Sequence, residues 1–307
     1  MPRHAFLDQL IRGEFFLLDG AMGTELERRG VNVPLPLWSA DALRSAPDTV
    51  QKIHEDYIRA GADILTAATF RTTKRTMAKA GLKPDEAGRL TALAVSLARE
   101  ARTAVAAGRD TGREIWIAGA LAPLEDCYRP QAAPGQAEAT PEHTAQARSL
   151  VEAGADILLI ETMNTIAEAC AAATAAASTG VPFLVSFICA DPVSILSGES
   201  LADAARAVDA FVPAAILVNC TPPDIVGGCL DTLARSVQTP IGCYPNAGGT
   251  DFDTQEWELD TRESPEGLAR LASGWIRSGA LILGGCCGTG PEHIKALRAA
   301  LPPVLIE

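Results

Sequence analysis

The chain has 307 residues, of which 48% are hydrophobic and 21% charged, and its formal net charge is −12. No apolar run approaches the ~18 residues that a membrane-spanning helix needs, and no Lys/Arg cluster is present to neutralise the phosphates of a nucleic acid. The first residues, 1–19, carry charges and lack a small-residue cleavage site, so we expect no signal peptide and a cytoplasmic location. The acidic net charge instead favours cationic small molecules, through a weak and diffuse field.

Three segments of the chain resemble one another: AGADILT at 60–66, AGADILLIET at 153–162 and SGALILGG at 278–285. Each follows a helical pattern of apolar residues and places a glycine (Gly61, Gly154 or Gly279) where the helix would end. Glycine suits that position because it adopts the left-handed conformation at low cost. A short apolar run of strand length comes next, so the sequence predicts a repeated helix-to-strand connection.

The same template predicts eight short strands. They lie near 15–19, 63–67, 115–119, 156–160, 183–187, 215–219, 240–244 and 280–284. Because these runs are continuously apolar, they indicate a parallel sheet buried on both faces. Eight strand–helix units fit a closed (β/α)8 barrel formed as one domain over residues 1–307. An open doubly wound sheet is the alternative, although no Gly-x-Gly-x-x-Gly turn follows the first strand.

Four motifs between the predicted strands have the residues that start helices. They are Ser45 with Asp48, Thr140-Pro141, Thr165 with Glu168, and Ser264-Pro265. Two polar stretches, 124–140 and 245–263, are longer than ordinary connections, so we expect them to be lids over an active site.

In a barrel of this type, the chemistry lies at the carboxyl ends of the strands. The residues that follow the first, fourth, sixth and eighth runs are Asp19-Gly20-Ala21-Met22, Glu161-Thr162, Asn219-Cys220 and Gly284-Gly285-Cys286-Cys287-Gly288. Two carboxylates and three cysteines would then share one rim. From residue type alone, a helix cap for Asp19 and a rim salt bridge for Glu161 are at least as good an interpretation as a catalytic role.

The adjacent cysteines, Cys286 and Cys287, are the most informative of these residues. The glycines around them would give the backbone the freedom to aim both sulfurs at one ion. With Cys220 as a third ligand, the fourth tetrahedral position would stay open, as in a catalytic zinc site. A redox disulfide between Cys286 and Cys287, or simple packing of small residues at a glycine-rich turn, are the alternatives.

A zinc site made of thiolates favours a soft ligand such as another thiolate. A free thiol has a pKa near ~8.5, and binding to zinc ionises it at neutral pH. The sulfur of a bound substrate would remain electron-rich. Alkyl transfer to sulfur is therefore a more natural reaction for this site than hydrolysis.

At these residues the chain resembles the homocysteine S-methyltransferase family. The matching segments are LLDGAMGTELERRG (17–30), PLWSA (36–40), AGADILT (60–66), IAGALAPLEDCYRP (117–130), LLIET (158–162), LVNC (217–220), YPNAG (244–248) and GGCCGTGPEHI (284–294). They cover nearly the whole chain, and the pairing of LVNC with GGCCGTGPEHI is highly specific. The resemblance implies a (β/α)8 barrel whose zinc is held by the catalytic residues Cys220, Cys286 and Cys287.

The resemblance also implies how homocysteine is bound. Asp19 and Glu161 would face its amino group, and Asn219 would orient the site. The homocysteine carboxylate would meet the backbone N–H groups of Gly20, Ala21 and Met22.

By the same resemblance, the homocysteine thiolate attacks a methyl group of a sulfonium or quaternary ammonium donor and gives methionine. S-methylmethionine is the favoured donor, with S-adenosylmethionine or a betaine as variants. Trp38 is a candidate for a cation–π contact with the donor, and packing under a loop is the alternative for this residue. Many relatives carry Thr-Asn-Thr-Tyr after the second strand, where this chain reads Ala-Ala-Thr-Phe at 67–70, so the sequence leaves the donor open. No cobalamin or folate domain is expected after the barrel.

Two other functions fit the residues. One is methyl transfer to a different thiol or to a selenol, and the other is a zinc-storage or redox-sensing barrel without turnover. His54 and His143 fall on predicted helices, and we expect both to lie away from the rim. The sequence does not define the oligomeric state.

Overall fold

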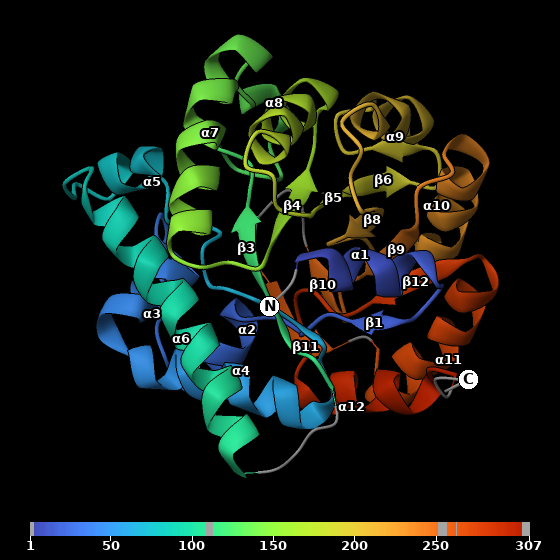
Figure 1. Cartoon of the computed structure of the whole chain (residues 1–307), viewed down its shortest axis with the longest axis horizontal. Helices are drawn as coiled ribbons and strands as arrows, with labels where there is room; N and C mark the ends of the chain where they lie inside the picture. Colours follow the sequence, from blue (N-terminus) through green and yellow to red (C-terminus); the bar gives the residue numbers. More distant parts are fainter. Residues whose placement is uncertain (1–2, 109–112, 251–256, 262, 303–307) are drawn as a thin grey trace.

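The computed structural model describes residues 3–108, 113–250, 257–261 and 263–302. Its main sheet has eight strands in the order β1-β12-β9-β8-β5-β4-β3-β2, and all neighbouring pairs are parallel. A parallel bridge between Leu18 and Ile64 links the two outer strands of that order. The sheet is therefore closed, and the predicted (β/α)8 barrel is confirmed while the open sheet is excluded (Figure 1).

Each predicted apolar run overlaps one strand of the barrel, and the strands near 115–119 and 156–160 extend beyond the predicted ends. The strands are β1 (Phe16–Leu17), β2 (Ile64–Thr66), β3 (Trp116–Leu121), β4 (Ile157–Met163), β5 (Phe183–Phe187), β8 (Ala215–Asn219), β9 (Ile241–Tyr244) and β12 (Ala280–Leu283). The main helices between and after them are α4 (Pro47–Ala60), α6 (Glu86–Gly108), α7 (Gln136–Glu152), α8 (Ile166–Ala177), α9 (Leu201–Asp209), α10 (Pro223–Ser236), α11 (Pro265–Arg277) and α12 (Pro291–Ala300). In the part of the chain that the structure describes, no helix is both long and apolar enough to cross a membrane.

The smaller elements lie outside this repeat. They are α1 (Arg3–Ile11), α2 (Gly23–Arg28), α3 (Ser39–Ser45), α5 (Lys74–Lys79), the 3-10 turn at Pro130–Ala132, the hairpin of β6 (Cys189–Asp191) with β7 (Ser194–Ile195), and the hairpin of β10 (Gly248–Thr250) with β11 (Trp257–Thr261). The second hairpin falls within the predicted 245–263 lid. The predicted 124–140 lid is shorter than expected, because α7 already begins at Gln136.

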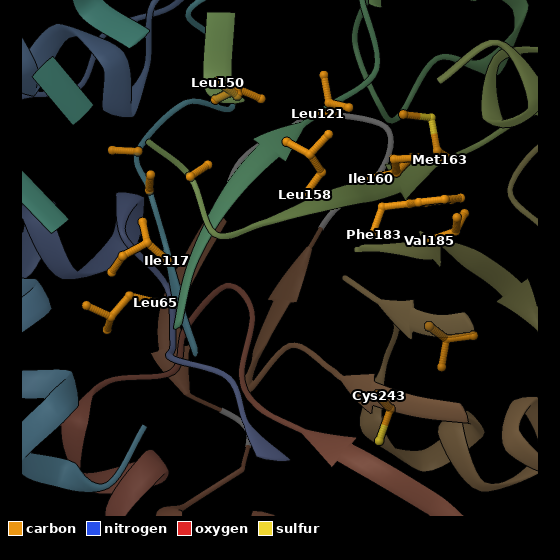
Figure 2. Close-up of a cluster of buried hydrophobic side chains, with 14 of the residues drawn as sticks. Leu65, Ile117, Leu121, Leu150, Leu158, Ile160, Met163, Phe183, Val185 and Cys243 are labelled. Atoms are coloured by element: carbon orange, nitrogen blue, oxygen red, sulfur yellow. The ribbon is translucent and has the colours of Figure 1, made fainter. Parts of the chain in front are cut away.

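Alternation along the strands divides the core into two layers. One set of side chains, including Leu18, Trp116 and Leu159, fills the barrel interior. The other set, including Leu158 and Val185, packs outward against the helices, as Figure 2 shows for part of this layer. Both layers are apolar, which is why the strands read as continuous apolar runs in the sequence.

The amino-terminal end of the barrel is covered by α1. Phe6 of this helix packs against Phe16 and Trp116, with ring centroids 4.8 and 5.5 Å apart. Nearby, the buried Asp63 accepts a hydrogen bond from the Leu17 N–H (2.9 Å) and pairs with two arginines, Arg113 and Arg298. These contacts cover the amino-terminal end of the barrel, so an active site is expected at the opposite, carboxyl end.

The glycine positions were predicted correctly. Gly61, Gly154 and Gly279 all have positive φ, of 117°, 98° and 94°. These values lie in the left-handed region where a side chain is strained, so the three repeated segments do end helices before strands.

Two of the four predicted helix starts are right. Thr165 and Ser264 each accept a hydrogen bond from the backbone three residues on, at the starts of α8 and α11. The other two are wrong. Thr140-Pro141 lies inside α7, which starts after Gly135, and Ser45 ends α3, with its hydroxyl bonded to the carbonyl of Asp41.

Candidate metal centre and substrate pocket

The three predicted cysteines come together at the carboxyl end of the barrel. Cys220 directly follows β8, and Cys286 and Cys287 lie in the turn after β12. The turn is fastened to the loop after β9, since the Cys286 N–H donates to the Pro245 carbonyl (2.7 Å) and the Cys287 carbonyl accepts from the Ala247 N–H (2.9 Å).

The residues with positive φ around the cysteines are not all the ones that the sequence suggests. Of the three glycines, only Gly288 has positive φ (81°), and Cys220 itself has φ of 50°. Gly284 and Gly285 are required for space instead, because a Cβ would come within 2.6 Å of Leu18 and 2.4 Å of Thr289. The tight packing of these glycines brings the adjacent cysteines close to β1.

The three sulfurs form a compact cluster. The Sγ of Cys287 lies 4.0 Å from that of Cys220 and 3.9 Å from that of Cys286. Both values match the sulfur–sulfur edge of about 3.8 Å expected for a tetrahedral zinc with Zn–S near ~2.3 Å. The Cys220–Cys286 separation is 2.7 Å, so a small side-chain rotation would complete the set. All three cysteines are free, and the predicted alternative of a Cys286–Cys287 disulfide is not formed.

The cluster is a candidate metal site by the chemistry of its donors. Among the described residues, it is the one group of three or more potential ligands that lie within 4.8 Å of one another. Hydrogen bonds from the Cys220 and Cys287 thiols lower the pKa of Cys286 well below that of an ordinary thiol. The same cluster raises the pKa of Cys220 and Cys287 well above that of an ordinary thiol, through their hydrogen bonds to Cys286 and their burial. A metal-binding role needs ionised sulfur, so a bound cation would have to ionise these two thiols.

Asp19 lies in the turn after β1, with its side chain buried. Its Oδ2 accepts a hydrogen bond from the Thr66 N–H (2.8 Å), so it joins β1 to β2 and does not cap α2. The turn is held from outside by Tyr57, whose hydroxyl donates to the Ala21 carbonyl (2.7 Å). The predicted alternative of a helix cap is therefore wrong.

Glu161 projects from the end of β4, where the strand is irregular and Thr162 has φ of 61°. Asn219 fixes this irregularity, because its Oδ1 accepts from the Thr162 N–H (3.0 Å) and its Nδ2 donates to the Thr162 hydroxyl (2.7 Å). Asn219 is fully buried and does not line the pocket. Its hydrogen bonds to Thr162 fit the expectation that it orients the site, and a direct contact with substrate stays a prediction.

The two carboxylates lack a cationic partner. Within the described ranges, neither pairs with a lysine or arginine, so the predicted alternative of a salt bridge for Glu161 is not seen. Burial raises the pKa of Asp19 to about 7. The pKa of Glu161 is raised well above its usual value by burial, with the charges of Cys286 and Asp19 adding to the effect. A ligand with a positive charge would stabilise both groups.

His54 contradicts the expectation that it lies away from the rim. It projects from α4, is fully buried, and places Nδ1 3.9 Å from Oδ2 of Asp19. Burial lowers the pKa of His54 to about 4, so the ring is neutral at pH 7. His54 lies four residues after Val50 and three before Tyr57, on the buried face of α4, so the periodicity predicts an inward side chain. It does not predict which residue at the strand ends that side chain meets.

A pocket of about 270 Å³ opens beside the sulfur cluster. Its wall includes all the predicted site residues except Asn219, and also residues that the sequence did not single out, such as Arg71 and Tyr128. Tyr128 lies within the matching segment 117–130, which was an available signal, whereas Arg71 follows the segment 67–70 that departs from the family. Trp38 packs against the cysteine cluster, and its ring meets Phe70 edge-on with centroids 5.8 Å apart.

The altered 67–70 segment does border the pocket. Ala67, Ala68 and Phe70 line it, whereas Thr69 is turned into the structure and accepts a hydrogen bond from the Ala120 N–H (2.9 Å). Trp257, in the polar stretch 245–263, is by sequence a weaker candidate than Trp38 for contact with the donor. The side chains at 249–262 lie outside those that the structure describes, so this role stays a prediction. Cys243 packs in the outer layer of the core, as Figure 2 shows, and not against the metal site.

A closed (β/α)8 barrel with a thiol cluster and two buried carboxylates on one rim defines the class of protein. The family model described as homocysteine S-methyltransferase matches residues 16–301. Homocysteine S-methyltransferase YbgG of Bacillus subtilis (strain 168) is 35% identical over 295 residues, which cover 92% of this chain and 93% of that protein. The chain belongs to the homocysteine S-methyltransferase family, and it is an enzyme of the methyltransferase class.

Two further comparisons bear on the site. The metallated form of the homocysteine methyltransferase MmuM from Escherichia coli superposes with a TM-score of 0.85 at 30% identity, covering 98% of this chain and 100% of that one. The selenocysteine Se-methyltransferase of Brassica oleracea var. italica is 31% identical, covering 94% of this chain and 89% of that protein.

Proposed function

We propose that this protein transfers a methyl group from an onium donor to the thiol of homocysteine and forms methionine. The observation that carries the proposal is the placement of three thiols, all within 4.8 Å, beside two buried carboxylates without a cationic partner. A thiol-bearing amino acid supplies a sulfur for the first group and an ammonium for the second. We further propose that residues 1–307 act as one domain in the cytoplasm.

The amino acid acceptor has a complementary position for each of its groups. Its ammonium would lie between Asp19 and Glu161, where it offsets the cost of burying two carboxylates. Its carboxylate would meet the N–H groups of Gly20 and Met22. The Ala21 N–H donates to the Thr289 hydroxyl (3.2 Å), so it would join them only by releasing that bond.

The metal that fits this donor set best is zinc, held by Cys220, Cys286 and Cys287. When bound, it would lower the pKa of the acceptor thiol and hold the sulfur as a thiolate. The acceptor thiolate attacks the methyl carbon, and a new C–S bond forms. The bond between that carbon and the donor's onium atom breaks, and its electron pair passes to the donor. The chain's own residues orient the acceptor and exclude water.

The favoured donor is S-methylmethionine, with S-adenosylmethionine and glycine betaine as variants. The pocket of about 270 Å³ lies near the lower end of the ~300–1,000 Å³ typical of small-molecule sites, which is consistent with a donor of amino acid size. The ring of Trp38 packs beside the sulfurs, and this supports the proposal that it contacts an onium methyl group.

A selenol acceptor is the second candidate, since a relative named selenocysteine Se-methyltransferase is 31% identical to this chain. Selenium and sulfur are both soft and would bind in the same position. Homocysteine and selenocysteine should be compared directly as competing acceptors.

The test is methionine formation from homocysteine by reduced, zinc-loaded protein, with each of the three donors in parallel. Methionine from one donor, abolished in Cys287→Ala, would support the proposal. Zinc bound at one per chain without methionine from any donor would contradict the proposal. The remaining functions would then be methyl transfer to a selenol, or a zinc-binding barrel that catalyses no reaction.

A further inference from the structure

The pocket has a cationic side chain, Arg71, to which the proposed transfer reaction assigns no role. Arg71 lies directly after the altered 67–70 segment and lines the pocket. Its guanidinium carbon lies 5.3 Å from the centroid of the Phe70 ring, so the planar group is held against an aromatic wall. An arginine in a pocket meant for an onium cation is unexpected, because like charges repel.

Most of the hydrogen-bonding capacity of Arg71 is unused. Within the described part of the chain, one hydrogen bond is formed, from Nη1 to the Glu125 carbonyl (3.3 Å), and Nε is buried without an acceptor. A guanidinium has five N–H donors in a fixed fork that matches a carboxylate. A buried donor without a partner costs free energy, and a bound anionic group would recover it.

The side chains of the wall have a defined order. Trp38 packs against the sulfur cluster, Phe70 meets Trp38 edge-on at 5.8 Å, and Arg71 stacks on Phe70. The onium methyl must lie near the sulfurs to react, and Arg71 is connected to the sulfur cluster through the rings of Phe70 and Trp38. A small donor with its onium group at one end and an anion at the other would match both positions.

We propose that Arg71 binds the carboxylate of the methyl donor, and that the enzyme thereby selects zwitterionic donors. The inference rests on the proposed function and specifies its donor class: small onium compounds that carry a carboxylate. Onium donors without an anionic group lack a partner for Arg71 and place a second cation in its field. The acidic Asp126, which also lines the pocket, is a further group near the donor's path.

The experiment compares S-methylmethionine with its carboxamide, which has the same shape and no negative charge. We expect the wild type to prefer the carboxylate donor by about 10–100-fold in kcat/KM, as a charge-assisted pair implies. Arg71→Gln should reduce this preference to near one, and Arg71→Lys should retain part of it. Arg44→Gln, which removes the same charge from the exposed face of α3, is the matched control and should keep the wild-type preference.

The ratio of the two donors is measured within each variant, so partial loss of folding cannot imitate the effect. A preference that survives in Arg71→Gln, or equal use of both donors by the wild type, would overturn the proposal. Calorimetric titration of each donor into the zinc-loaded protein gives the same comparison without turnover. If no methionine forms but Arg71→Gln still abolishes the preference in binding, the proposed reaction fails and the carboxylate site stands.

Discussion

Nδ1 of His54 lies 3.9 Å from Oδ2 of Asp19, and both side chains are buried beneath the rim of the barrel. Burial keeps His54 neutral, with a pKa of about 4, and Asp19 protonated up to a pKa of about 7. Between these two pKa values, Asp19 is therefore protonated and His54 is neutral, and neither side chain carries a charge. A bound ammonium group would lower the pKa of Asp19, so that the side chain ionises and the carboxylate pairs with the ammonium.

This pair predicts a pH dependence of stability. The unfolded chain releases the Asp19 proton near pH ~4, so Asp19 lowers stability as the pH rises from ~4 to about 7. The unfolded chain protonates His54 near ~6.5, so His54 lowers stability as the pH falls from ~6.5 to about 4. The two slopes oppose each other in the wild type.

Asp19→Asn should remove the pH dependence of stability that Asp19 causes and leave the one that His54 causes. Between pH 6.5 and 4, we expect its free energy of unfolding to fall by about 3 kcal/mol more than that of the wild type. Urea unfolding at several pH values measures this. Parallel curves for the variant and the wild type would show that the pair does not titrate as described.

The metal site predicts a contrast between two cysteines. Cys220→Ala should lose its zinc, because two thiolates and an open position bind the ion more weakly than three. Cys243→Ala is the matched control, since Cys243 is equally buried but packs in the outer core. Elemental analysis of the purified variants gives the metal content. Equal zinc in both variants would place the ion elsewhere.

The position of Trp38 depends on Gly23. A Cβ on residue 23 would come within 2.2 Å of the indole ring, so Gly23→Ala should displace Trp38. We expect KM for the donor to rise about 3–30-fold, the range of a lost cation–π contact, while KM for homocysteine stays constant. Gly88→Ala is the control, because a Cβ there meets no atom within 4 Å. A donor KM unaffected by Gly23→Ala would exclude Trp38 from donor binding.

The amino-terminal end of the barrel should affect stability without affecting catalysis. Asp63→Ala leaves the Leu17 N–H and two arginines without their acceptor, and we expect a loss of about 3 kcal/mol. Asp203→Ala breaks an exposed pair with Arg206 and should cost no more than about 0.5 kcal/mol. Denaturant unfolding measures both, and a loss at Asp63 as small as that at Asp203 would be inconsistent with the role given to it.

The barrel was predictable because its determinants are local. Gly61, Gly154 and Gly279 mark the helix ends, and the apolar runs that follow them are strands. The start of α7 was not predictable in the same way. Thr140-Pro141 has the residues of a helix start, but Pro141 is the sixth residue of α7, where its missing N–H removes one hydrogen bond of the helix. The local rule, which places proline at the first helical position, therefore points to the wrong residue.

The residues of the site also fall into two groups, those that local sequence predicts and those that it does not. Cys220, Cys286 and Cys287 follow strand ends, and the topology alone brings them together. The spacing along α4 predicts that His54 is buried, but not that it meets Asp19. That contact, and the path of the loop that carries Arg71, depend on packing over the whole barrel, which no spacing in the sequence encodes.

The central claim is that three cysteines hold a zinc ion whose remaining position takes the sulfur of the substrate. X-ray absorption spectroscopy of the zinc-loaded protein, with and without homocysteine, tests it most directly. We predict three sulfur neighbours near ~2.3 Å without substrate and four with it. A sulfur count that stays at three when homocysteine is saturating would contradict the account.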